Sequence, residues 1–325
     1  MFYRRKILLA LIETFGGSLP QEDGKALVFL FCLRREKNFY DFFPVNNGVY
    51  SVILQSDKRR LTALGFLTDV PDFHINEDQG YINQLQKKDQ MVLRTFQSEI
   101  GDRRNEALLQ LMGTHIPSLA PRNVHFADSI LPSEAMQKTC PWNETSSPCV
   151  FTLGYEGLSI DAYLDILLSH DVKAIIDVRK NPISMKPGYS KKQFAAAAQT
   201  AGLTYIHIPD LGIPSRLRKD LTNDEAYRNL FTYYAAEILP EHRDALEQVK
   251  TLSHDFERVA LTCFEANPVC CHRHKIGEYL QNDPQFKVPI KHLDAHSPSW
   301  LSFQSLASTQ VSHGFLAKNA VYSLV

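Results

Sequence analysis

Five short apolar runs recur between residues 149 and 293, and this pattern limits the possible fold more than any other feature. The runs are CVFTLGY, VKAIIDV, TYIHI, RVALTC and VPIKHL, and segments with helical periodicity separate them. None of these runs shows the polar–apolar alternation of a strand that has one solvent-exposed face. Such strands are typical of a sheet covered by helices on both sides. We therefore expect an open, mostly parallel α/β sheet with flanking helices.

The chain before residue 138 has a different, mainly helical periodicity. The turn signal Asn47-Gly48 follows a short β-like stretch, and a basic helix is expected over about 51–64 with Gly65 at its end. This order of elements resembles a small bacterial winged-helix domain, and a helical packing or dimerisation domain is the alternative. The resemblance is carried by Gly48, Tyr50, Ser51, Leu61, Leu64 and Gly65. It implies nucleic-acid binding through Lys58, Arg59 and Arg60.

A stretch rich in Pro, Ser, Thr and Asn, KTCPWNETSSPC, separates these two regions. We predict a mainly α, winged-helix-like domain over 1–137, a linker over 138–149, an α/β domain over 150–293 and a C-terminal tail over 294–325.

The composition of the 325 residues is that of ordinary globular protein, with 44% hydrophobic and 22% charged residues. The formal net charge of −1 gives no sign of a nucleic-acid partner, so any such sign must come from local patches. Six scattered cysteines do not form a disulfide framework, and no apolar run reaches membrane-spanning length. We expect a cytoplasmic protein without a membrane partner, and a homo-oligomer is possible.

Polar or special-backbone residues follow four of the predicted strands at their carboxyl ends. The segments are GYEG (154–157), DVRKNPIS (177–184), HIPDLGIP (207–214) and CFEANPVCCHR (263–273). Ligands of open α/β sheets bind at this edge. The sequence therefore predicts a site there.

Cations are concentrated in the loops after the second and third of these strands. They are Arg179, Lys180, Lys186, Lys191 and Lys192 in the first loop, and Arg216, Arg218 and Lys219 in the second. Converging cations would make a basic rim suited to a phosphate-bearing ligand, whereas scattered surface lysines are the alternative. Tyr155, Tyr189 and Tyr205 could stack on a base, or pack as core aromatics.

The cysteine-rich segment after the fourth strand allows three interpretations. Cys263, Cys270, Cys271, His272 and His274 offer zinc ligands, but the segment has no C-x2-C pair, and adjacent residues seldom face one metal. Cys271 before a helix, with Arg273 nearby, could instead be a nucleophile, as in rhodanese loops. In the third interpretation the cysteines pack, and Glu265, His272 and Arg273 carry out binding or acid–base work.

The four strand-end motifs together resemble the bacterial family DUF488, whose pattern is GY-x-G, DVR-x-x-P-x-S, Y-x-H-x-x-x-LG and C-x-E-x(5)-CHR. The resemblance covers about residues 150–293 and leaves the reaction open. It singles out Gly154, Tyr155, Gly157, Asp177, Arg179, Pro182, Ser184, Tyr205, His207, Leu211, Gly212, Cys263, Glu265, Cys271, His272 and Arg273.

These features lead to the hypothesis of an enzyme, a hydrolase or transferase, directed at nucleic acid or a nucleotide, with DNA favoured over RNA. Glu265, His207 and Cys271 are the candidate catalytic groups, and Asp177 would orient an arginine or bind a metal. Arg179 and Arg273 would hold phosphate, with Gly154, Tyr155, Gly157, Ser184, Tyr205 and His272 around it. Lys186, Lys191 and Lys192 would contact nucleic acid. The alternatives are a non-catalytic DNA-binding regulator and a rhodanese-like sulfur-handling enzyme. No cofactor is predicted, because the spacing does not support zinc or another divalent metal.

Overall fold

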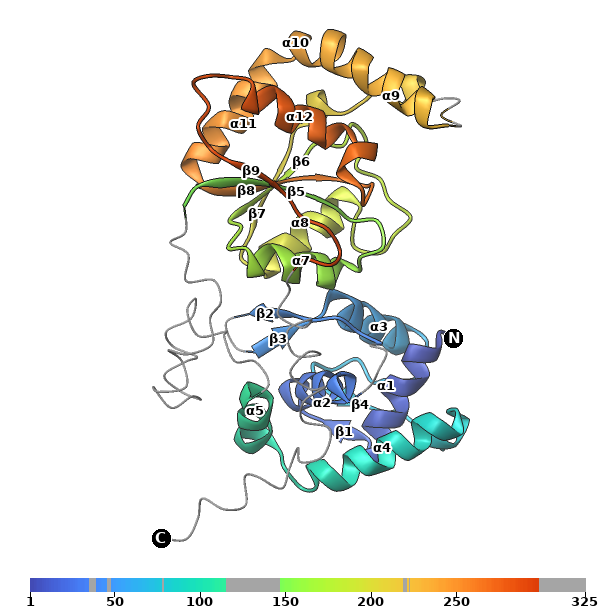
Figure 1. The fold of residues 1–325 in the computed structure, drawn as a ribbon. Coiled ribbons are helices and arrows are strands. Elements are labelled where there is room, and N and C mark those ends of the chain that lie inside the picture. Colours follow the sequence, from blue (N-terminus) through green and yellow to red (C-terminus); the bar gives the residue numbers. More distant parts are fainter. Residues whose placement is uncertain are drawn as a thin grey trace, which may run out of the picture. The chain divides into compact units, whose positions relative to one another are not determined.

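A computed structural model describes residues 1–34, 39–45, 48–77, 79–114, 147–218, 221 and 223–297. The chain forms two compact units, and the described residues up to 114 and from 147 onward belong to different units (Figure 1). Residues 138–146 of the predicted linker, 298–325 of the predicted tail, and Asn47 and Lys219 lie outside the described residues.

The first unit is mainly helical, as its periodicity predicts. Its helices are α1 (Tyr3–Thr14), α2 (Gln21–Leu33), α3 (Val52–Ala63), α4 (Lys87–Ile100) and α5 (Asn105–Thr114), with a short 3-10 turn at Tyr81–Gln84. Strands β1 (Ser18–Leu19) and β4 (Phe73–His74) pair antiparallel, as do β2 (Phe43–Val45) and β3 (Gly48–Tyr50). The apolar residues of α1 and α2 form a large part of one buried core. The winged-helix assignment stays a prediction.

The predicted basic helix is α3, and its ends show why it forms there. The Ser51 side chain accepts a hydrogen bond from the Leu54 amide, and Gly65 has the positive φ of 79° that ends many helices. The basic residues of α3 differ in exposure. Lys58 is buried, its ammonium group donates to the Pro71 carbonyl and lies 4.6 Å from the Phe73 ring centroid, whereas Arg59 and Arg60 are exposed. Of these three basic residues, only Arg59 and Arg60 are therefore accessible to solvent.

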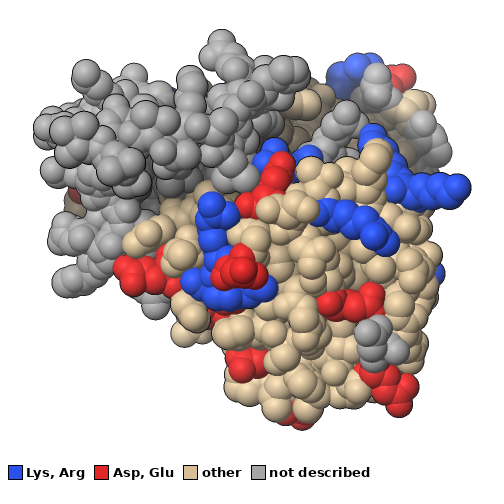
Figure 2. Space-filling view, turned by 90° about the horizontal axis from the view of Figure 1, so that it is seen from below, with Lys and Arg blue, Asp and Glu red and all other residues tan. Residues whose placement is uncertain are grey.

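Surface charge is mixed on the face drawn in Figure 2. Lys and Arg side chains there are interspersed with Asp and Glu over a largely uncharged surface. This face therefore offers no broad region of one sign.

The second unit contains a five-stranded sheet in which every neighbouring pair is parallel. Its strands are β5 (Cys149–Gly154), β6 (Ala174–Asp177), β7 (Thr204–His207), β8 (Arg258–Cys263) and β9 (Ile290–His292), and their order across the sheet is β7-β6-β8-β5-β9. All five predicted strands are confirmed, and so is the α/β fold class. The register pairs Gly154 with Cys263 and Asp177 with His207, so these strand ends lie side by side.

Helices cover both faces of this sheet (Figure 1). One face carries α7 (Ile160–Ser169) and α8 (Lys191–Thr200). The other carries α9 (Asp224–Tyr233), a π-helical turn at Tyr234–Ile238, α10 (Leu239–Glu241), α11 (Arg243–Asp255) and α12 (His272–Gln281). The predicted helix break near Pro240 is present, because α10 ends at Glu241 and α11 begins at Arg243. Among the described residues, no helix is long and apolar enough to cross a membrane.

The connections explain why the site lies at the end of β8. The chain runs from β5 through β6 to β7 across the sheet, then reverses through β8 to β9. Since parallel crossovers are right-handed, this reversal sends the two sets of helices to opposite faces. The loop after β8 therefore leaves toward one face, and the loops after its neighbours β5 and β6 leave toward the other. Ligands of open α/β sheets bind at such a point.

Candidate active site

A buried ion pair joins two residues at the end of β6. The Asp177 carboxylate accepts hydrogen bonds from Arg179 at both oxygens, at 2.8 Å from Nε and 2.6 Å from Nη2. Asp177 is 0% and Arg179 5% exposed. The Tyr205 hydroxyl donates to the same carboxylate at 2.6 Å. Of the two roles expected for Asp177, the structure shows the orientation of an arginine.

The remaining contacts of Arg179 are also internal. Its Nη1 donates to the Tyr155 hydroxyl at 2.8 Å, and its Nη2 donates to the Tyr189 carbonyl at 2.9 Å. Burial opposes the charge on Arg179, but the Asp177 carboxylate outweighs it and raises the pKa. The rings of Tyr155 and Tyr189 stack on each other at 4.1 Å, and both residues are buried. Arg179 and these tyrosines therefore hold the loops together rather than facing a ligand.

Several other predicted site residues brace the loop after β6. The Nε2 of His207 lies 2.8 Å from the Arg179 carbonyl, and its Nδ1 lies 3.0 Å from Lys191 Nζ. Lys186 donates to the Tyr155 carbonyl at 2.9 Å, and the Ser184 hydroxyl accepts from the Lys186 amide at 3.1 Å. Of the three lysines in this region that are predicted to contact nucleic acid, Lys186, Lys191 and Lys192, the last has no such bracing role among the described contacts, and it is exposed.

The loop after β8 passes directly over the end of β5. A Cβ placed on Gly154 would lie 1.7 Å from the Glu265 carbonyl oxygen, so only glycine fits there. Arg273 is 0% exposed and donates to the carbonyls of Glu265 and Ala266, with 2.8 Å to the latter. Gly157 supplies the positive φ of 80° that the turn after β5 needs. Arg273 thus secures this loop, and the structure does not turn its guanidinium toward a phosphate site.

The same loop brings two thiols and an imidazole together. Nδ1 of His272 lies 3.6 Å from Cys263 Sγ and 3.9 Å from Cys271 Sγ, and all three residues are about 1% exposed. We call these three residues the thiol–imidazole cluster. Burial raises the pKa of the Cys271 thiol well above its usual value, and the neighbouring Cys263 adds to this. Cys271 is therefore shielded from solvent rather than presented as an exposed nucleophile.

A pocket of about 290 Å³ lies against this cluster. Its walls are Ile213, Arg218, Leu221, Tyr227, Leu230, Phe231, Glu265 and His272. Glu265 also connects the pocket to the thiols, because its Oε2 lies 3.4 Å from Cys263 Sγ. Burial opposes ionisation of the Glu265 carboxyl, but hydrogen bonding by Cys271 and by its own backbone, together with the charge of Arg218, lowers its pKa. The pocket therefore combines a carboxylate, an arginine and an apolar wall.

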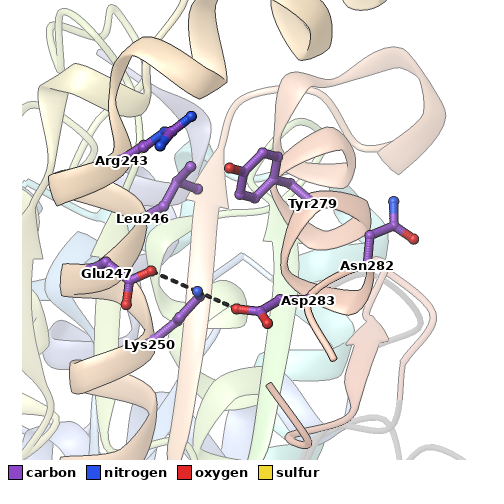
Figure 3. Close-up of a pocket in the computed structure, with 7 residues that line it drawn as sticks. All are labelled: Arg243, Leu246, Glu247, Lys250, Tyr279, Asn282 and Asp283. Carbon is purple, nitrogen blue, oxygen red and sulfur yellow. Dashed lines mark hydrogen bonds and ion pairs between the residues drawn. The ribbon is translucent and has the colours of Figure 1, made fainter. Parts of the chain in front are cut away.

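A second depression lies between α11 and α12, and Figure 3 shows its lining. Lys250 there is paired with both Glu247, at 2.7 Å, and Asp283, so its charge is already matched. Tyr279 lies in the last turn of α12, and Asn282 and Asp283 follow directly after it, at the end opposite His272. The depression therefore lies away from the strand-end motifs, and it holds neither thiol nor imidazole.

Sequence reasoning missed part of the pocket. Arg218 was expected only as one cation of a basic rim, and Tyr227 and Phe231 were not expected at all. Their spacing of four residues places both on one face of α9, which is the only signal that the sequence offers for them. The Val178 carbonyl, which lies 3.1 Å from His272 Nε2, leaves no signal in the sequence.

The second unit is thus a parallel α/β domain whose polar residues meet at the carboxyl end of its sheet. Residues 159–280 match the family model described as "Domain of unknown function DUF488", so this part of the chain is a DUF488 domain. The match extends from the cap of α7 to the last turn of α12. It includes the last three of the strand-end motifs, and GYEG lies just before it. No curated protein and no solved structure shows significant similarity to the chain.

Proposed function

We propose that the DUF488 domain is an enzyme that acts on a phosphate-bearing substrate, a nucleotide or a nucleic acid, in the pocket beside β8. The observation that carries this proposal is the presence of Glu265 and Arg218 in the walls of one pocket. A volume of about 290 Å³ is close to the lower end of typical ligand pockets, ~300 Å³.

Arg218 is the group that would hold the substrate's negative charge. It is exposed, and it forms no ion pair with any residue that the structure describes. Arg179 and Arg273, in contrast, are buried with carboxylate or carbonyl partners. We therefore assign to Arg218 the phosphate-binding role that the sequence suggests for these two arginines.

Glu265 is the residue positioned to accept or donate a proton. It lines the pocket with an acidic side chain that is partly accessible, whereas the thiols behind it are about 1% exposed. The apolar wall opposite, with Tyr227, Leu230 and Phe231, would contact a base or sugar. The first unit would add contacts to nucleic acid through the exposed Arg59 and Arg60.

Turnover by the whole chain tests this proposal. Nucleotides and end-labelled oligonucleotides of DNA and RNA would be incubated with the wild type, with Glu265→Gln and with Glu278→Gln. Glu278 is an exposed control on α12 that pairs only with nearby Lys275 among the described residues. A base or acid is typically worth about 10²–10⁴-fold in rate, so Glu265→Gln should lose that much and Glu278→Gln nothing. Binding without any product would favour the regulator alternative.

Sulfur handling is a second candidate function, favoured by the closeness of the Cys263 and Cys271 thiols to one imidazole nitrogen. It requires a thiol that can carry sulfur, so Cys263→Ser or Cys271→Ser should abolish sulfur transfer from a thiosulfate donor. Because both thiols are buried, this function would also require the loop after β8 to move, so that a thiol becomes accessible from the pocket.

A further inference from the structure

The thiol–imidazole cluster has the composition and spacing of a metal site. One ligand atom from each of Cys263, Cys271 and His272 lies within 4.8 Å of the other two, and all three residues are buried. Thiolate and imidazole are the ligands that zinc prefers in proteins.

The distances fit a single tetrahedral ion. Zinc–sulfur and zinc–nitrogen bonds of ~2.3 Å and ~2.0 Å would hold sulfur and nitrogen about 3.5 Å apart. The observed separations from His272 Nδ1 are 3.6 Å to Cys263 Sγ and 3.9 Å to Cys271 Sγ. Only a small movement would therefore be needed to seat the ion.

The orientation of His272 is fixed as a metal ligand requires. Its Nε2 lies 3.1 Å from the carbonyl oxygen of Val178, on the neighbouring strand end. Because a carbonyl oxygen only accepts hydrogen bonds, Nε2 of the neutral ring carries the proton, and Nδ1 presents its lone pair to the sulfurs. A backbone carbonyl on the far ring nitrogen is a usual outer partner of zinc-bound histidine.

The backbone explains how two adjacent residues can face one ion, which the spacing alone argues against. Cys271 is extended, with φ −139° and ψ 140°, whereas His272 is the first residue of α12. The change from extended to helical backbone between them lets both side chains point toward Cys263, the last residue of β8. Cys263 and His272 thus lie in β8 and α12, and Cys271 is the N-cap residue of α12.

We propose that Cys263, Cys271 and His272 bind one zinc ion, with the fourth position open toward the pocket that Glu265 lines. On binding, each thiol loses its proton to solvent, and two thiolates and the neutral imidazole Nδ1 bond to the ion; no oxidation or reduction occurs. Three protein ligands and one open position are typical of catalytic zinc. This zinc site does not depend on the proposed function, and metal binding to it can be measured without any substrate.

Cobalt binding to the reduced, metal-stripped whole chain tests the site. We expect one Co²⁺ per chain, with the near-ultraviolet charge-transfer absorption that cobalt–thiolate bonds produce, and its displacement by Zn²⁺. Cys263→Ser, Cys271→Ser and His272→Ala should each weaken binding by more than the ~10–100-fold typical of losing an outer-shell partner. Cys270→Ser is the matched control, since Cys270 is exposed and adjacent to Cys271.

Two results would overturn the proposal. One is a folded, reduced wild type that shows no thiolate–cobalt absorption, as expected if the cysteines only pack. The other is a Cys270→Ser variant that loses as much affinity as Cys271→Ser. The wild-type spectrum reports thiolate ligation without any substitution, so a variant that fails to fold does not affect this part of the test. Substrate turnover is not measured, so a failed proposed function would leave this result unchanged.

Discussion

Gly154 at the end of β5 lies so close beneath Glu265 that a Cβ on it would fall 1.7 Å from the Glu265 carbonyl oxygen. The loop that carries Glu265 and the thiol–imidazole cluster is therefore seated on the neighbouring strand. Arg273 reinforces this position by donating hydrogen bonds to the carbonyls of Glu265 and Ala266.

Gly154→Ala should accordingly displace this loop or prevent the second unit from folding, because both colliding atoms belong to backbone. Gly157→Ala is the control. A Cβ there meets no atom within 4 Å, and only the positive φ of 80° is strained, at a cost of about 1 kcal/mol. Chemical unfolding followed by circular dichroism compares the two. Equal losses in the free energy of unfolding would contradict the close approach.

Asp177→Asn should destabilise the second unit by about 3–5 kcal/mol, since it leaves the buried guanidinium of Arg179 without its counter-charge. Lys180→Ala serves for comparison. Lys180 and Asp210 form an exposed pair at 3.3 Å, and such pairs contribute at most about 1 kcal/mol. The midpoint of urea unfolding gives both values. If Asp177→Asn cost no more than Lys180→Ala, Arg179 would be free to hold a ligand as the sequence suggests.

Stability should fall on acidification partly through His170. Burial lowers the pKa of His170; its hydrogen bond to Ile166 opposes this, and the charges of Arg258 and Lys291 add to the lowering. The folded pKa therefore lies below the unfolded value of ~6.5, so the stabilisation is complete above that pH and is lost as the pH falls through the folded pKa. His170→Gln should reduce the loss of stability between about pH 7 and about pH 5. An unchanged pH dependence would show that His170 does not contribute.

The fold of the second unit could be predicted because its signals are local. The apolar runs of β5, β6 and β8 are buried almost throughout, whereas those of the edge strands β7 and β9 are partly exposed. Capping residues such as Ser159 begin helices where the pattern changes. The edge that carries the site follows from the same strands. The sequence therefore predicts the edge of the sheet at which these polar residues meet.

The roles of individual residues could not be read in the same way. Arg179, which is buried and paired, and Arg218, which lines the pocket, cannot be told apart in the sequence. Only their contacts in the folded structure distinguish them. In the sequence, the adjacency of Cys271 and His272 argues against their facing one metal ion. The change from extended to helical backbone between them, which brings both side chains toward Cys263, is not visible in the sequence.

The most direct test of the proposed active site is the binding of a labelled, 5′-phosphorylated single-stranded DNA, competed by nucleoside monophosphates. Fluorescence anisotropy of the whole chain would compare wild type, Arg218→Ala and Arg216→Ala over a salt titration. Arg216 lies on the same short turn, is exposed and does not line the pocket. We predict wild-type binding that weakens as salt rises, at least about tenfold weaker binding by Arg218→Ala, and little change in Arg216→Ala. Equal binding by wild type and Arg218→Ala would contradict the proposal that this pocket holds a phosphate.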